Sequence, residues 1–165
     1  MGDWYAEILV PRRNLMSEQL IKFGMIGLTG IFFVGGFLIH PFMLIGGMLM
    51  VLADYFVFPR FKVEYEYRYI EGQFDIDAIY NKMKRKRKYT LDISNCEVIA
   101  PIGSKKLEPF QFDYKVIDFT SREEDAKPYV FVCPDKRVKV HLEIAGEEKV
   151  LKDIALRRPR NFFRE

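Results

Sequence analysis

The feature that most constrains this chain is a stretch of 31 residues, from Phe23 to Ala53, that contains no Asp, Glu, Lys or Arg. As a single helix it would be about 46 Å long, whereas the hydrocarbon core of a bilayer is about 30 Å thick. Pro41 lacks a backbone donor and disfavours helix at His40, so we expect a break there. The sequence therefore predicts a transmembrane α-helical hairpin over residues 20–58, with its turn near 39–41. A signal peptide would be shorter and nearer the N-terminus.

Small residues within this stretch and an acidic residue directly after it give two further expectations. Gly24, Gly27 and Gly30 recur every three residues, and we assign them to helix packing because small residues let membrane helices approach closely. The alternative is that glycine is simply common in membrane helices. Asp54 is the one acid near the second span, and we expect it to be solvated at the membrane interface. A proton-carrying role for Asp54 is the alternative.

Cationic residues flank the hairpin on both sides, whereas its turn carries only His40. They are Arg12, Arg13 and Lys22 before it and Arg60, Lys62 and Arg68 after it. Because positive charge accumulates on the cytoplasmic side of membrane proteins, both termini are predicted to be cytoplasmic. Residues 1–19 would then form an N-terminal interfacial segment, with Trp4 and Tyr5 at the level of the headgroups.

The remainder of the chain is polar, and its periodicity changes. From Arg60 onward lie 23 of the 26 Lys and Arg residues and 19 of the 23 Asp and Glu residues. Apolar and polar residues alternate there, which is typical of half-buried strands. About seven strands are predicted, over residues 62–70, 73–80, 85–93, 96–102, 109–119, 129–133 and 137–144. Helical spacing follows over 147–158, so the fold class is an α+β membrane protein whose second part is mainly antiparallel β.

Two stretches carry a resemblance to known proteins. YEYRYIEGQFDIDAI and KRKRKYTLDISNCEVIAP look like a family of small, uncharacterised bacterial membrane proteins. In these proteins an N-terminal two-helix membrane hairpin precedes a pleckstrin-homology-like domain of about seven strands and a C-terminal helix. The resemblance extends from about residue 20 to the end of the chain. It implies a cytoplasmic pleckstrin-homology-like β domain over 60–165, tethered to the bacterial inner (cytoplasmic) membrane by a multi-pass anchor.

A run of cations is the main candidate for a binding site. Six of the seven residues from position 82 to 88 are cationic: Lys82, Lys84, Arg85, Lys86, Arg87 and Lys88. We assign these six to the binding of an anionic surface, because anionic lipid attracts cations near a membrane by about 1 kcal/mol each. The alternatives are a solvated hairpin whose cations pair with Asp75, Asp77 and Asp92, or contact with nucleic acid or an acidic protein patch. The membrane tether and the net charge of only +3 disfavour nucleic acid.

No pattern indicates catalysis. Asp75 and Asp77 have a spacing that can hold a divalent ion, but alternation along a strand places both on the wet face. G-x-S-x-G, P-loop, HExxH and dinucleotide-binding motifs are missing from the sequence. Cys96 and Cys133 have no CxxC partner, and we expect buried, reduced thiols. We therefore expect neither a metal nor another cofactor.

Together these patterns predict a membrane-anchored, non-catalytic binding or scaffolding module. Its β domain would contact proteins or anionic lipid surfaces. The expected partners are the lipid bilayer, anionic headgroups, and an unidentified membrane protein or a second copy of the chain. The alternative function is an accessory or regulatory subunit of a membrane transporter or channel complex, in which the glycine-lined hairpin is the working part.

Overall fold

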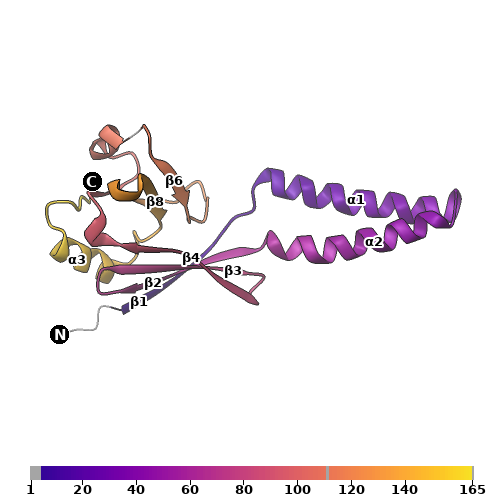
Figure 1. Ribbon diagram of the computed structural model, residues 1–165, viewed down its shortest axis with the longest axis horizontal. Coiled ribbons are helices and arrows are strands. Elements are labelled where there is room, and N and C mark those ends of the chain that lie inside the picture. Colours follow the sequence, from indigo (N-terminus) through magenta and orange to yellow (C-terminus); the bar gives the residue numbers. More distant parts are fainter. Residues whose placement is uncertain (1–4, 111, 165) are drawn as a thin grey trace. The chain divides into compact units, whose positions relative to one another are not determined.

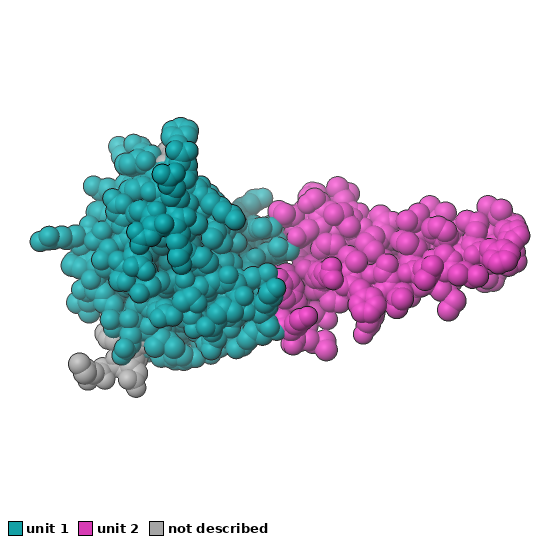
Figure 2. Space-filling model, viewed as in Figure 1, with its two compact units in different colours: residues 1–13, 64–79, 85–165 teal, residues 14–63, 80–84 magenta. Residues whose placement is uncertain are grey.

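The computed structural model describes residues 5–110 and 112–164. The chain forms two compact units, which Figure 2 shows in different colours. The hairpin unit contains residues 14–63 and 80–84, and the β-unit contains the other described residues. Each unit is therefore assembled from segments that are separated in the sequence.

Two helices make up most of the hairpin unit. Helix α1 (Met16–Leu38) and helix α2 (Phe42–Val57) lie side by side and are joined by a turn at residues 39–41 (Figure 1). The His40 carbonyl accepts a hydrogen bond from the Met43 amide at 3.0 Å, which starts α2 directly after Pro41. A short 3₁₀ helix, η1 (Phe58–Arg60), ends the hairpin. Both helices are long and apolar enough to cross a membrane, α2 being counted together with η1.

Glycines near the turn allow the two helices to touch. A Cβ atom on Gly36 would lie 2.5 Å from Leu44 Cδ2, and one on Gly47 would lie 3.2 Å from the Phe33 ring. The three glycines singled out in the sequence behave differently, because beyond the local helix backbone no described atom lies within 4 Å of a Cβ placed on Gly24, Gly27 or Gly30. These three therefore do not pack the hairpin against itself.

Asp54 lies where the sequence analysis did not expect it. Its side chain is buried between α1 and α2 and only 9 % of the residue is exposed, so the expectation of a solvated carboxylate is wrong. Thr29 Oγ1 lies 2.9 Å from Asp54 Oδ2 and 2.9 Å from the Met25 carbonyl oxygen. Asp54 Oδ1 is buried without a hydrogen-bond partner among the described residues. The hairpin thus holds one acidic group in an otherwise apolar contact.

The first sheet of the β-unit has the order β1-β2-β3-β4. Its strands are β1 (Tyr5–Pro11), β2 (Val63–Ile70), β3 (Gln73–Tyr80) and β4 (Lys84–Asp92). Strand β1 pairs antiparallel with β2, from Tyr5 opposite Ile70 to Pro11 opposite Glu64. The sequence analysis missed β1, because it treated residues 1–19 as an interfacial segment. Tyr5 belongs to this edge strand, and Trp4 lies outside the described residues.

The second sheet has the order β5-β7-β8-β6. Its strands are β5 (Val98–Pro101), β6 (Lys115–Asp118), β7 (Tyr129–Cys133) and β8 (Val138–Leu142). All pairs are antiparallel except β6 with β8, which is parallel. The strand expected over 109–119 is wrong in its first half: Lys105–Phe110 form a 3₁₀ helix, η3, and Phe112 is 82 % exposed.

The core of the β-unit lies between the apolar faces of the sheets and helix α3 (Glu148–Arg157). Phe74 of the first sheet contacts Phe131 of the second, with ring centroids 5.6 Å apart. Helix α3 buries Val150, Leu151 and Ile154, as its helical spacing predicts. Every second residue of β2 is buried on the same side, from Val63 to Tyr69. The Tyr69 hydroxyl also donates to Asp153 of α3 at 2.6 Å, which fixes the helix over the sheet.

Candidate anion-binding surface

The cationic run begins in a tight turn between β3 and β4. Asn81 and Lys82 both have positive φ, 49° and 57°, and the Met83 amide donates to the Tyr80 carbonyl at 3.0 Å. Such left-handed pairs suit the twist of two-residue hairpin turns. Met83 is 87 % exposed between two lysines. The Asn81 amide donates to the Lys62 carbonyl at 2.8 Å, so the turn lies within the hairpin unit, against the residues that follow η1.

The two arginines of the run are bound to acids of the same sheet. The Arg85 guanidinium donates to the Glu66 carboxylate. Arg87 Nε donates to Asp77 Oδ1 at 3.1 Å, and a second Arg87 nitrogen lies 3.0 Å from Asp75. Both arginines of the run therefore pair with acids of β2 and β3.

Two of the three acids that hold these arginines are themselves buried, and Asp75 is partly exposed. Glu66 is 2 % exposed and Asp77 is 3 % exposed, so the expectation that Asp77 lies on a wet face is wrong. Arg68 completes the cluster, with its Nη2 atom 2.8 Å from Asp77. Burial raises the pKa of Glu66 and a hydrogen bond with Glu7 raises it further, whereas the charge of Arg85 lowers it. An unpaired buried charge is costly, so we expect Arg85 and Arg87 to remain paired with the acids of this cluster.

The lysines of the run have a different role. Lys82, Lys84, Lys86 and Lys88 are all exposed. The six candidate residues therefore separate into two half-exposed arginines that neutralise buried acids and four exposed lysines. An external anion can reach these four exposed side chains. The alternation of polar and apolar residues could not predict this difference between the arginines and the lysines. It does not reveal that long cationic side chains cover the acids.

The described residues contain no group of three His, Cys, Asp or Glu side chains that could hold a metal ion. Cys96 and Cys133 are buried and are not joined by a disulfide, but their sulfur atoms lie 3.3 Å apart. The sequence analysis treated them as separate core thiols. Their spacing of 37 residues gives no sign of this contact, which arises because β5 pairs with β7.

Two largely antiparallel sheets followed by a C-terminal helix are consistent with a pleckstrin-homology-like domain. The profile of a family described as a bacterial PH-like domain (DUF6106) matches residues 2–164. The chain therefore belongs to this family, and the resemblance found in the sequence is confirmed. The match includes the helical hairpin and strand β1 as well as the rest of the β-unit. No curated protein and no solved structure matched the chain.

Proposed function

We propose that this protein is a membrane-anchored, non-catalytic binding module. Its hairpin spans the bacterial inner membrane with both termini in the cytoplasm, and its PH-like β-unit contacts an anionic surface. PH-like domains generally serve as binding modules, which agrees with the absence of catalytic motifs from the sequence.

The observation that carries the proposal is the apolar surface of the hairpin. Large apolar side chains point outward along both helices, including Ile31 at 63 %, Phe37 at 80 % and Met48 at 69 % exposure. A core helix of a water-soluble protein would be covered, whereas most of these two helices is not covered by the described chain. A bilayer accounts for this surface, since soluble monomers rarely expose large apolar patches.

Membrane insertion is tested by extraction. We expect the full-length protein to stay in the membrane pellet after washing with alkaline carbonate and to enter the supernatant only with detergent. A matched control is a variant in which a short Gly-rich turn replaces residues 14–62, which is feasible because Pro11 and Glu64 are paired neighbours. A reporter fused after Glu165 should be active only inside the cell. Recovery of the full-length protein in the carbonate supernatant would contradict the proposal.

The four surface lysines support contact with anionic lipid. Lys82 and Lys84 belong to the same compact unit as the helices and flank the exposed Met83. An apolar side chain between cations is typical of segments that lie at a membrane interface. Four such lysines can each contribute about 1 kcal/mol close to anionic lipid.

This surface is tested by replacing the four lysines with Gln while Arg85 and Arg87 are kept. In the variant whose hairpin is replaced, we expect the substitutions to abolish sedimentation with phosphatidylserine-containing vesicles at low salt. Substitution of Lys105, Lys127, Lys149 and Lys152, which are also exposed, changes the net charge equally and should have little effect. Equal losses in both variants would show a general charge effect instead of a binding surface.

A second candidate function is an accessory subunit of a transporter or channel complex. The open strip at Gly24, Gly27 and Gly30 favours it, because no neighbouring atom lies within 4 Å of these positions. A second membrane helix could approach closely there.

A further inference from the structure

The β-unit contains a pair of thiols in direct contact. Cys133 is the last residue of β7, and Cys96 lies just before β5, which pairs with β7. Their sulfur atoms are 3.3 Å apart, whereas a disulfide requires about 2.05 Å. Because the strand pairing already holds the two residues together, small side-chain rotations would close the remaining gap.

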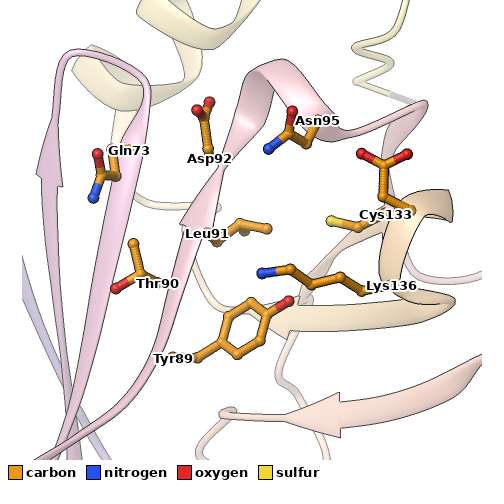
Figure 3. Close-up of a pocket in the computed structure, with 9 residues that line it drawn as sticks. Gln73, Tyr89, Thr90, Leu91, Asp92, Asn95, Cys133 and Lys136 are labelled. Carbon is orange, nitrogen blue, oxygen red and sulfur yellow. The ribbon is translucent and has the colours of Figure 1, made fainter.

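The two thiols differ in their position relative to a cleft in the described part of the β-unit. Cys96 is fully buried, whereas Cys133 lines an open cleft of about 330 Å³. The cleft lies between β3, β4 and the turn after β7, and Tyr89, Leu91 and Lys136 are among its walls. Figure 3 shows the Cys133 sulfur and the Lys136 amine pointing in the same direction, toward Leu91 and Tyr89. A small molecule in this cleft would therefore meet Cys133 first.

The surroundings favour the thiolate of Cys133. The Cys96 thiol can donate to Cys133, which lowers the pKa of Cys133. Burial opposes this effect by raising the pKa, while the charge of Lys136 lowers it and the charge of Asp135 raises it. The same hydrogen bond raises the pKa of Cys96, and burial adds to that increase. Lys136 is held nearby, with Nζ 5.4 Å from the centroid of the Tyr89 ring. Thiolates are the reactive form of cysteine, so the two thiols have unequal roles.

We propose that Cys96 and Cys133 form a reversible oxidation site that closes to a disulfide when a small peroxide enters the cleft. The Cys133 thiolate attacks one oxygen of hydrogen peroxide, the O–O bond breaks, and hydroxide leaves and takes up a proton to become water. The resulting sulfenic acid on Cys133 is attacked by the Cys96 sulfur. An S–S bond then forms, and the S–O oxygen leaves as a second water after taking the Cys96 proton. Two thiols thus lose two electrons and two protons, and a small-molecule thiol can restore them by exchange.

The site is tested on the full-length protein in mild detergent. Reduced protein is treated with hydrogen peroxide, unfolded, and alkylated with N-ethylmaleimide. Untreated protein should take up two alkyl groups. Oxidised protein should take up no alkyl group and should remain a monomer on a non-reducing gel. After reduction it should again take up two alkyl groups. Two alkyl groups after treatment, or a disulfide between chains, would overturn the proposal.

Single variants separate the roles of the two thiols. In Cys96→Ser the sulfenic acid cannot be resolved, so dimedone should label Cys133 once, whereas Cys133→Ser should show no dimedone label. A label on Cys96 in the second variant would overturn the assignment of Cys133 as the attacking thiol.

Two lysine variants test the role of the cleft in oxidation without changing either cysteine. Lys136→Gln should slow oxidation of the wild-type pair roughly two- to tenfold at pH 7, because thiolate becomes scarcer, and the difference should shrink as the pH rises. Lys139→Gln removes a lysine from β8 that does not line the cleft, and it should oxidise at the wild-type rate. Equal rates for the Lys136 and Lys139 variants would contradict the role of the cleft.

Discussion

At the scale of single residues, the charged side chains of this protein are less exposed than their sequence pattern implies. Asp54, Glu66 and Asp77 are all buried. Glu66 and Asp77 are paired with arginines, whereas the hydrogen bond given to the Asp54 carboxylate within the described residues comes from the Thr29 hydroxyl. Alternation predicted which faces of β2 and β3 are polar, but it could not predict that arginines from a neighbouring strand would cover that face. This pairing matters for stability, because removing one partner of a buried ion pair leaves the other charge buried without a counter-ion.

His141 gives a prediction at the same scale. It lies in β8 opposite Asp118 of β6, and burial lowers its pKa, while Asp118 raises it and Lys139 lowers it. Below the ordinary histidine pKa the unfolded chain binds a proton that the folded chain resists, so stability falls as the pH falls from 7 to 5. His141→Gln should reduce this loss by up to about 1 kcal/mol, measured as the difference in thermal unfolding between pH 7 and pH 5. An identical loss in both proteins would contradict this effect.

At the scale of elements, the sequence predicted segments with strong local periodicity and missed those that depend on distant partners. The break at Pro41, strands β2, β3, β7 and β8, and helix α3 follow from local pattern. Strand β1 was missed because it ends in a proline and its partner lies beyond the whole hairpin. The alternation of Phe110, Phe112 and Tyr114 predicted a strand, but Pro109 lies in a 3₁₀ turn and the polypeptide becomes extended only at Lys115.

The glycines of the helices give a prediction for these elements. Gly36→Leu places side-chain atoms against Leu44 and should destabilise the hairpin by about 1–3 kcal/mol, as overpacked sites usually do. A Cβ atom at Gly24, Gly27 or Gly30 has no neighbour within 4 Å beyond the local helix backbone, so leucine at these positions should leave the hairpin intact. Resistance of the hairpin to proteolysis in detergent measures both effects.

The same triple leucine variant distinguishes the two candidate functions. If the protein is a subunit of a larger membrane complex, the triple variant should migrate at a lower mass than the wild type in mild detergent. An unchanged mass would favour the tethered binding module. The outcome could not be predicted from spacing alone, because glycines that pack the hairpin and glycines that leave it open have similar sequence surroundings.

At the scale of the whole molecule, the chain does not divide into consecutive domains. The β-unit begins before the hairpin, resumes at residue 64, and is interrupted again by residues 80–84. The sequence analysis placed a boundary near residue 60 because composition changes sharply there. Composition indicates whether a segment prefers water or an apolar environment, but not which distant segment it pairs with. The contribution of β1 to the first sheet therefore could not be predicted from composition.

The pairing of β1 with β2 has a consequence for the order of assembly. Strand β1 is synthesised before both helices and its partner β2 only after them. Joining the ends of so long a loop is entropically costly while the loop is unstructured. A folded helical hairpin brings its own two ends together, and it therefore removes most of the entropic cost of closing the loop. The first sheet should therefore acquire its edge strand only after the two helices have formed and packed together.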